Sequence, residues 1–535
     1  MSNRRRFVLK KQNFIKGSII LMVSAAAAKL LGAVFKIPLT NILGGVGMSY
    51  FSCAYSLFMP VYALAVTGLS SAVAKLTAES TALGMHRNAA KVRRTALALF
   101  SAVGLAGSLL ILLLAKPFSA YVIGLPEASA AVAMIAPAVF FGCITAVERG
   151  YYEGMSNMYP TAFSQVAEGM VKALAGLLLC GFTAAHPRTV MALFPFVTDI
   201  RAAAAAAGIL GVTLSTAGAA LFFAVMRLFS KAPQGGEAHV MSRRAIAREL
   251  WATALPVGVS SVVTNLTALI DMWTVIGCIS RYGCPSGLPE GVPEAELPQF
   301  IYGSFAGIAL TVFNLVPSVT NMLGKGALTC IAAAKGSGDR CGLERGTSQA
   351  LLSAALIAVP AAVGLGVLAP EVLSFLFPRQ SDEVAVCIGS LRYLMAGMVC
   401  LCVSFPLFSM LQAVGKPAAP LKIMLLGTAV KLAGNLLLIP AMGADGAALS
   451  TSLCYAVILG LSLRVYIRAS EVRISAAPFG KVLYAGAMCG GAALLAAEAM
   501  RRREVPVMAV LAVSGAVGGA VYIGLVLALI GRAKK

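Results

Sequence analysis

Charged residues are scarce in this 535-residue sequence, at 12% of the chain, whereas 59% of the residues are hydrophobic. Soluble globular proteins contain roughly 25% charged residues. A soluble chain must cover its surface with polar groups, so this deficit excludes an ordinary soluble enzyme or binding domain. Lipid can replace that polar surface, and the composition therefore predicts an integral membrane protein.

Acidic residues are the scarcer kind of charge, with 21 Asp and Glu against 43 Lys and Arg and a formal net charge of +22. Such a charge can serve nucleic-acid binding, but the basic residues here form no single stripe with interleaved aromatic residues. They lie in short runs between apolar segments, as in the loops of membrane proteins. We therefore expect no nucleic-acid partner, and a positive charge that orients the chain and can meet an anionic substrate or anionic membrane lipids.

Motifs that carry catalytic or metal chemistry are missing as well. The 12 Cys residues include no Cys-x-x-Cys pair, and no His/Cys spacing suggests a metal, so we expect no metal site and no disulfide framework. No P-loop for ATP is present. We therefore expect a non-enzyme without catalytic residues or cofactors. If such a chain moves a substrate across a membrane, the movement is passive or coupled to Na⁺ or H⁺.

The sequence does contain a long series of apolar segments, and about 20 such residues cross a bilayer. We predict an all-α integral membrane protein with about 14 transmembrane helices. The expected spans are residues 17–38, 49–72, 95–115, 129–147, 161–182, 203–229, 250–279, 301–333, 348–369, 384–412, 419–439, 443–467, 479–499 and 505–530.

Basic residues are distributed unevenly between the two sides of these spans. Of the 43 Lys and Arg residues, 30 lie in loops on the side of the N-terminus and eight lie in loops on the other side. The other five lie within spans. The positive-inside rule then predicts a multi-pass protein with both termini in the cytoplasm. Arg501, Arg502 and Arg503 disagree, because they fall on the outer side. Either this local charge is tolerated, or the last two spans are wrong.

An internal repeat organises the chain. A Gly/Pro turn at 154–160 precedes Lys172 in the middle of a span, and a similar turn at 412–417 precedes Lys431, 259 residues later. The repeat predicts two six-helix lobes in parallel around a central cavity, plus two extra C-terminal helices. The expected domains are an N-terminal lobe 1–230, a cytoplasmic basic linker 231–249, a C-terminal lobe 250–470, and residues 471–535 with the last two spans and a short tail.

Charged side chains inside spans are functional candidates, because a charge at mid-bilayer costs a few kcal/mol on insertion scales. The basic ones outnumber the acidic ones, and this excess suits an anionic ligand such as a phosphate or diphosphate. We predict a substrate-binding set of cavity cations and two carboxylates for charge balance or ion coupling. The cations are Lys29, Lys172, Lys431 and Arg392, and the carboxylates are Glu168 and Asp271.

Structural explanations for these charges remain open beside the functional ones. Glu168 precedes Lys172 by four residues, so the two can form an ion pair within one helix. Asp271 can pair with a basic residue of the first span, or serve as a proton or sodium site. An ion pair between or within the lobes is the structural alternative. Lys431 has no acidic residue three or four positions away, which makes it the better candidate for substrate contact.

At the cytoplasmic end of the fourth span, Arg149-Gly-Tyr-Tyr-Glu153 brings charges and tyrosines to the membrane interface. Tyrosine at this depth is ordinarily an anchor. An anchor and an inner gate formed by Arg149 and Glu153 are both consistent with the pattern.

Several motifs, spread along nearly the whole chain, are similar to those of one known protein family. They are Lys29-Leu-Leu-Gly32, Ile37–Gly44, Ser71–Leu76 with Glu79, Arg149–Gly154, Pro160–Glu168, Asn265–Asp271 and Tyr302-Gly-Ser304. Together they resemble the polysaccharide-biosynthesis flippases, near the branch of stage V sporulation protein B, and the Arg149–Glu168 segment is the most specific part. Many relatives carry Gln and other polar residues after Glu168, where this chain has Gly169-Met-Val-Lys172.

The resemblance implies two six-helix lobes that form a V-shaped cavity, in the superfamily of multidrug exporters and the lipid II flippase. It implies a lipid-linked oligosaccharide as cargo, a polyprenyl-diphosphate-linked sugar moved from the inner to the outer leaflet of the bacterial cytoplasmic membrane. Alternating access is the implied mechanism, and cell-wall synthesis proteins are the implied protein partners.

Three other functions compete with this interpretation. A cation-coupled multidrug exporter of the same superfamily requires an acidic cavity to bind cationic drugs, whereas the charges within these spans are mainly basic. A membrane-embedded glycosyltransferase needs carboxylates beside a sizeable extramembrane domain, but the largest outer loop, 280–299, has only about twenty residues. A non-transporting scaffold leaves the repeat and the charges in spans without a role.

Overall fold

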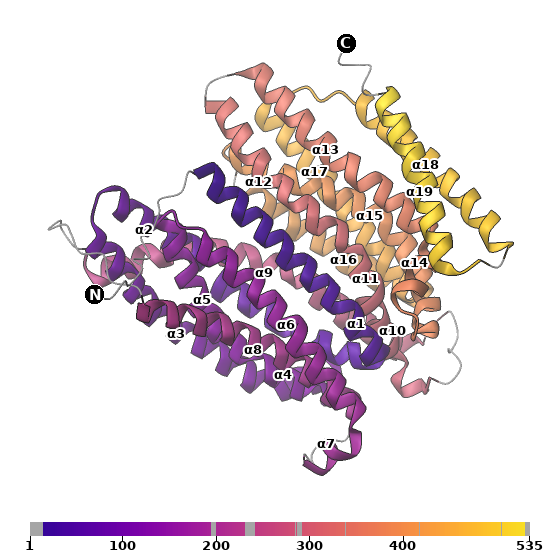
Figure 1. The fold of residues 1–535 in the computed structure, drawn as a ribbon, viewed down its shortest axis with the longest axis horizontal. Coiled ribbons are helices and arrows are strands. Elements are labelled where there is room, and N and C mark those ends of the chain that lie inside the picture. The colour runs from indigo at the N-terminus through magenta and orange to yellow at the C-terminus, as the bar shows by residue number, and fades with distance from the viewer. Residues whose placement is uncertain are drawn as a thin grey trace, which may run out of the picture. The chain divides into compact units, whose positions relative to one another are not determined.

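The computed structural model describes residues 14–193, 199–229, 241–283, 285, 292–336, 339–416, 418–503 and 505–529. This part of the chain is mostly helical and contains no strand (Figure 1). It holds 11 helices that are long and apolar enough to cross a membrane, or up to 12 if one bent pair counts as a span. The predicted all-α membrane fold is confirmed, whereas the count of about 14 spans is not.

Part of the difference in count arises at the N-terminus, where Val23–Ala82 forms one helical stretch of 60 residues. It contains α1 (Phe14–Tyr62), a π-helical turn η1 (Ala63–Thr67) and α2 (Gly68–Ala82). Within α1 the helical geometry breaks at Gly44, whose φ of 66° is a conformation that glycine adopts without steric cost. The first two expected spans therefore lie in one stretch with a sharp break, without a separate loop.

The described residues divide into two compact units. Unit 1 is Met1–Phe35 with Tyr50–Leu269, and unit 2 is Lys36–Ser49 with Ile270–Lys535. Both α1 and α9 (Arg243–Tyr282) thus contribute to both units. The domain boundaries expected from the sequence stay a prediction.

In unit 1 a central helix, α5 (Pro137–Gly154), packs against α2, α3 and α8, and α6 packs along α8. Most residues of α5 are buried, because helices surround it. The other helices of the unit are α3 (His86–Pro117), α4 (Ser129–Ile135), α6 (Tyr159–Ala185), α7 (Pro187–Leu193) and α8 (Ile200–Phe229).

In unit 2 the central helix is α15 (Ser381–Ala413), which packs against α12, α13 and α17. Its C-terminal end joins a core that includes Leu407, Met410, Ile458 and Tyr466. Around it lie α10 (Leu297–Ser304), the π-helical turn η5 (Phe305–Ala309), α11 (Leu310–Phe313), α12 (Leu315–Gly336), α13 (Arg340–Val367), α14 (Ala369–Leu376), α16 (Ala419–Met442) and α17 (Ala444–Ser470).

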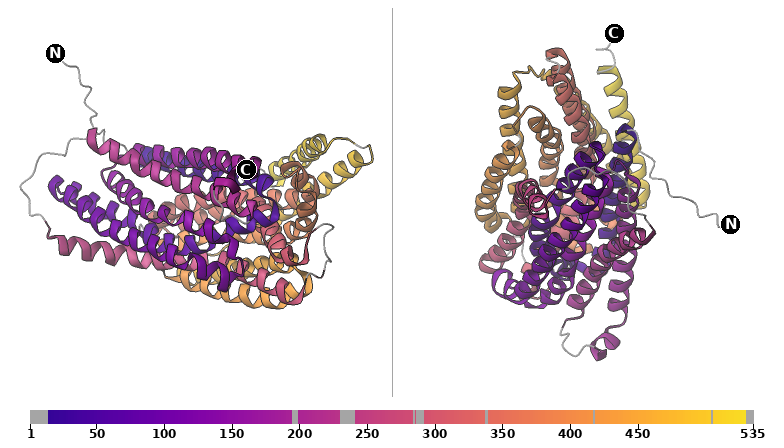
Figure 2. Two further views of the ribbon diagram at one scale, coloured as in Figure 1. Left: turned by 90° about the horizontal axis from the view of Figure 1, so that it is seen from below. Right: turned by 90° about the vertical axis from the view of Figure 1, so that its left-hand side faces the viewer.

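The last two helices, α18 (Ala477–Arg501) and α19 (Val507–Leu529), run side by side in all views (Figures 1 and 2). Both are candidate membrane spans, so the alternative that they were wrongly assigned finds no support. Arg501 pairs with Glu371 of α14, and Arg502 lies 3.5 Å from Glu498. These carboxylates offset the local charge that disagrees with the positive-inside rule.

Candidate functional site

The structure distributes the predicted site residues over both units. Arg149, Glu153, Glu168 and Lys172 lie in unit 1, and Asp271, Arg392 and Lys431 lie in unit 2. Lys29 lies on α1, but its side chain is outside the described residues.

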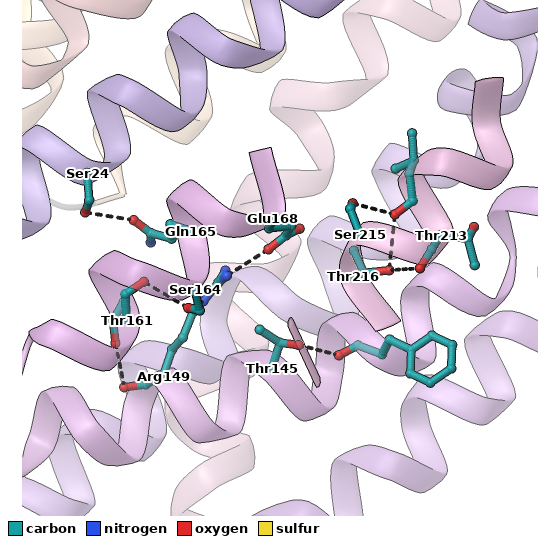
Figure 3. A network of polar contacts seen from close by, with 12 residues as sticks. Ser24, Thr145, Arg149, Thr161, Ser164, Gln165, Glu168, Thr213, Ser215 and Thr216 are labelled. Carbon is teal, nitrogen blue, oxygen red and sulfur yellow. Dashed lines mark hydrogen bonds and ion pairs between the residues drawn. The ribbon is translucent and has the colours of Figure 1, made fainter. Parts of the chain in front are cut away.

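In unit 1, Arg149 of α5 reaches the face of α6 that carries Ser164 and Glu168 (Figure 3). One guanidinium nitrogen lies 2.7 Å from a Glu168 carboxylate oxygen, and Nε donates to Ser164 Oγ at 2.9 Å. Ser164 and Glu168 are four residues apart, so they share one face of the helix. The side chains of Arg149 and Glu168 are only 16% and 24% exposed, which strengthens their attraction relative to a surface pair.

The next residue on α6 extends this network to α1. The hydroxyl of Ser24 donates to Gln165 at 3.3 Å (Figure 3). Gln165 and Glu168 thus connect α6 to α1 and α5, respectively. The most specific motif of the sequence, Arg149–Glu168, is therefore a polar cluster that joins three helices.

Lys172 lies one turn beyond Glu168, but the ion pair that this spacing allows within α6 is not formed, and Glu168 pairs with Arg149. The Lys172 ammonium lies 5.9 Å from the ring centroid of Phe35 on α1, within reach of a cation–π contact. Gly32 of α1 lies beside it, since a Cβ there would be 3.4 Å from the nitrogen, an ordinary van der Waals contact. Among the side chains that the structure describes, no carboxylate pairs with Lys172.

A second ion pair of unit 1 was missed by the sequence analysis. Arg93 of α3 pairs with Glu148 of α5 at 2.5 Å, and the two side chains are 12% and 4% exposed. The guanidinium also lies 4.7 Å from the ring centroid of Tyr151. The consecutive residues Glu148 and Arg149 therefore bind α3 and α6. Because Arg93 falls in a basic loop by sequence, its charge is explained by membrane orientation, and only the packing reveals its partner.

Glu153, the other residue of the predicted inner gate, lies in the last turn of α5 and is partly buried. It follows Arg149 by four residues on the same helix. Whether the two act as a gate stays a prediction.

In unit 2, Lys431 of α16 and Asp271 of α9 form a buried ion pair with a nitrogen–oxygen distance of 2.6 Å. Their side chains are 4% and 3% exposed. The residue that the sequence singled out for substrate contact therefore meets a carboxylate 160 positions earlier in the chain. Of the alternatives for Asp271, the structure forms an ion pair within one unit, and its partner is Lys431 and not a basic residue of the first span.

Asn435 and Thr274, which the sequence analysis did not single out, complete this buried cluster. The Asn435 amide donates to Asp271 at 3.1 Å and to Thr274 Oγ1 at 2.8 Å. Asn435 follows Lys431 by four residues and so lies on the same helix face. This spacing could have predicted from the sequence that Asn435 belongs to the cluster. Both carboxylate oxygens of Asp271 thus accept a hydrogen bond, and the cluster is electrically neutral.

Arg392, the remaining predicted cation, is exposed on α15 and joins neither cluster in the structure. In unit 1, Arg149 pairs with Glu168, and Lys172 adds a positive charge that forms no ion pair among the described side chains. This arrangement can bind an anion through Lys172. Among the described residues no group of three or more His, Cys, Asp or Glu could hold a metal ion.

Comparison with known proteins identifies family models and relatives that match this chain. A family model described as polysaccharide biosynthesis protein matches residues 14–284, and a second model, MatE, matches residues 304–437. The stage V sporulation protein B of Bacillus subtilis is 24% identical over 472 residues, which is 87% of this chain and 84% of the relative. The lipid II flippase MurJ of the same organism is 22% identical over 461 residues, with 82% and 80% covered.

Solved structures share the fold at low sequence identity. A lipid II flippase MurJ in an inward closed conformation aligns with a TM-score of 0.70 at 13% identity, over 97% of this chain and 100% of that chain. An inward-facing multidrug resistance MATE family transporter aligns with a TM-score of 0.65 at 16% identity, over 85% and 98%. The chain therefore shares its fold with both of these proteins.

Proposed function

Because the chain belongs to the family of polysaccharide biosynthesis proteins, we propose that it is a flippase. Its cargo is a polyprenyl-diphosphate-linked sugar, a precursor of peptidoglycan or of another polysaccharide. The protein moves the headgroup from the inner to the outer leaflet of the bacterial cytoplasmic membrane by alternating access, while the lipid tail stays in the bilayer. The relatives named stage V sporulation protein B and lipid II flippase support this class of cargo.

The observation that carries the proposal is the charge balance around Lys172. Glu168, the carboxylate nearest in sequence, is held by Arg149 at 2.7 Å. The ammonium lies over an aromatic ring and in the field of Glu168, but no described carboxylate forms an ion pair with it. A diphosphate supplies the missing negative charge and accepts strong charge-assisted hydrogen bonds from an ammonium group.

The other predicted residues take roles around this centre. Lys29 and Arg392 attract the headgroup as further cations, and Lys431 acts through the neutral cluster with Asp271. Arg149 and Glu153 stand at the inner end of the path, where Arg149 also keeps Glu168 away from Lys172.

The alternative, a cation-coupled multidrug exporter, is favoured by the shared fold with MATE transporters. Such a transporter needs a carboxylate in its spans that can exchange a proton, a sodium ion or a cationic drug. The two predicted carboxylates are both engaged, Asp271 by Lys431 and Glu168 by Arg149. Their engagement favours the flippase.

The test is a flipping assay in proteoliposomes with a labelled undecaprenyl-diphosphate sugar. The exposure of the sugar to an external, membrane-impermeant reagent is followed over time. We expect faster exposure than in empty liposomes, and loss of this acceleration in Lys172→Ala and Lys29→Ala. Lys422→Ala is the matched control, because Lys422 is exposed on α16. No acceleration by the unaltered protein, with or without a proton or sodium gradient, would contradict the flippase.

A further inference from the structure

A line of aromatic rings runs along α1 within unit 1 and begins at the ring over which Lys172 lies. Its five members are Phe35, Phe51, Tyr55, Phe58 and Tyr62, and neighbouring ring centroids are 4.9–6.3 Å apart. The Lys172 ammonium lies over Phe35 at one end of the line. The rings therefore lead away from the lysine that we propose as a diphosphate ligand.

The four rings after the break at Gly44 belong to two sides of the helix. Phe51 and Phe58 are seven residues apart and share one side, and Tyr55 and Tyr62 share another in the same way. The phenylalanines are 3% and 4% exposed, whereas both tyrosines are partly exposed. Packing explains the phenylalanines. It does not explain the two hydroxyl groups, because phenylalanine would fill the same space.

These two hydroxyl groups are unpartnered. Neither the Tyr55 nor the Tyr62 hydroxyl forms a hydrogen bond with another described residue. Tyrosine hydroxyls away from water ordinarily have a partner, and an unpartnered polar group in hydrocarbon is costly. Both tyrosines lie in the field of Glu168, and Tyr62 also lies in that of Arg149. They therefore face the polar cluster of α5 and α6 and are not turned to lipid.

Two further groups of this cluster have unused hydrogen-bonding capacity. Gln165 accepts from Ser24, but its amide nitrogen donates to no described residue (Figure 3). Glu168 accepts from Arg149 with one carboxylate oxygen, and the other oxygen accepts from no described side chain. Free donors and free acceptors thus surround an ion pair that has no net charge.

This combination of groups suits one class of ligand. A phosphate requires net positive charge and a cationic drug requires net negative charge, whereas Arg149 and Glu168 neutralise each other. A sugar ring carries hydroxyl groups that both donate and accept hydrogen bonds. Its C–H faces also pack on the electron-rich faces of aromatic rings. Partly exposed tyrosines beside an amide and a carboxylate offer all of these contacts.

We propose that Tyr55, Tyr62 and Gln165 form a sugar subsite, which binds the first sugar ring of the cargo while Lys172 binds the diphosphate. The tyrosine rings pack against the sugar, and the hydroxyl and amide groups form hydrogen bonds with it. The inference rests on the proposed flippase function and adds to it the residues that recognise the uncharged part of the headgroup.

The order of the two subsites along α6 matches the order of groups in the cargo. Gln165 precedes Lys172 by seven residues, which is two helical turns or about 10 Å. On the orientation that the loop charges predict, Gln165 is the nearer of the two to the cytoplasm. In a lipid of the inner leaflet the tail points to the middle of the bilayer, the diphosphate follows, and the sugar is nearest the cytoplasm. Diphosphate at Lys172 therefore places the sugar beside Gln165.

The experiment compares the binding of two labelled lipids to the purified protein. One is an undecaprenyl-diphosphate sugar, and the other is undecaprenyl diphosphate without a sugar. The double variant Tyr55→Phe with Tyr62→Phe keeps all five rings and removes both hydroxyl groups. Tyr484→Phe is the matched control, because Tyr484 is an exposed tyrosine on α18 in unit 2.

We expect the double variant to bind the sugar lipid about tenfold more weakly and the sugar-free lipid as the unaltered protein does, because two neutral hydrogen bonds are lost. Tyr484→Phe should bind both lipids normally, and Lys172→Ala should weaken both. Normal binding of the sugar lipid by the double variant, or equal weakening of both lipids, would overturn the subsite and leave the flippase standing. If the unaltered protein neither binds nor flips the sugar lipid, the proposed function fails and the subsite falls with it.

Gln165→Leu and the flipping assay provide a second measurement. Gln165→Leu keeps a side chain of similar size without the amide, and we expect about fivefold weaker binding of the sugar lipid alone. In proteoliposomes the double tyrosine variant should flip slowly at low lipid density and approach the unaltered rate at high density, because it has lost binding contacts. A lower rate at saturating lipid with unchanged affinity would contradict the sugar subsite.

Discussion

Lys172 and Lys431 hold matching positions of the sequence repeat, but their surroundings differ. Lys431 is buried against Asp271 at 2.6 Å, with Asn435 as a second partner of that carboxylate. Lys172 is partly buried and faces the ring of Phe35. The comparison shows that position in a repeat does not decide the role of a charge. The groups on the facing helices decide it.

We propose from this difference that Lys431 serves stability and Lys172 serves ligand binding. A buried ion pair whose partners are both hydrogen-bonded gains little net stability, but removing one partner leaves an uncompensated charge. A lysine without a carboxylate has the opposite property, because a ligand can supply the missing charge. The following predictions test this division, from the largest expected effect to the smallest.

The largest effect is expected for Lys431→Met. It leaves the Asp271 carboxylate buried without its cation, which costs about 3–5 kcal/mol. We expect a marked loss of monodisperse protein in detergent and a lower midpoint of thermal unfolding. Lys431→Met combined with Asp271→Leu removes both charges and should recover most of the loss. Equal instability of the single and double variants would contradict a charge-based cause.

Lys172→Ala is expected to act on transport and leave stability nearly unchanged. It removes a partly buried cation without exposing a partner, so the unfolding midpoint should stay close to that of the unaltered protein. Flipping should fall by about tenfold or more, because the diphosphate loses its charge-assisted hydrogen bond. Lys172→Arg, which keeps the charge, should retain part of the rate. Normal flipping by Lys172→Ala would contradict the proposed role of Lys172 in binding the ligand.

Arg149→Ala is expected to give Lys172 a carboxylate partner, as Lys431 has in Asp271. Without Arg149, the Glu168 carboxylate is free to pair with Lys172 four residues later on α6. Flipping should fall although the lysine is still present. The double variant Arg149→Ala with Glu168→Ala restores an unpaired lysine and should flip faster than Arg149→Ala alone. The two flipping rates, measured side by side, decide this point.

Arg340→Ala should have the smallest effect. Its ion pair with Glu471 has the short distance of a strong pair, 2.8 Å, but the side chains are 69% and 77% exposed. Exposed pairs contribute about 0–1 kcal/mol, because water and salt screen them. We expect unfolding and flipping within error of the unaltered protein. A large shift here would show that burial does not explain the behaviour of Lys431.

The sequence predicts the features of this molecule that depend on composition and on local spacing. Apolar runs locate the helices, and the Arg149–Glu168 motif lies in a polar cluster as its density of charges indicates. The partners of Lys431 and Arg93 could not be predicted, since Asp271 and Glu148 meet them only after distant helices pack. The loop expected between the first two spans was replaced by a break at Gly44, because helix continues on both sides of one permissive residue.

The pairing of Arg501 with Glu371 has a consequence for how the chain enters the membrane during synthesis. On the orientation that the loop charges predict, the α18–α19 hairpin must carry its arginines across the bilayer. A typical potential that is negative inside opposes each such charge by about 2.3 kcal/mol per 100 mV. Glu371, nearly buried on α14, is translated earlier and provides a destination for Arg501. Because Glu371 is synthesised first, it is already in place to pair with Arg501 when the last two helices insert. Glu371→Gln should therefore yield chains in which the α18–α19 hairpin fails to insert.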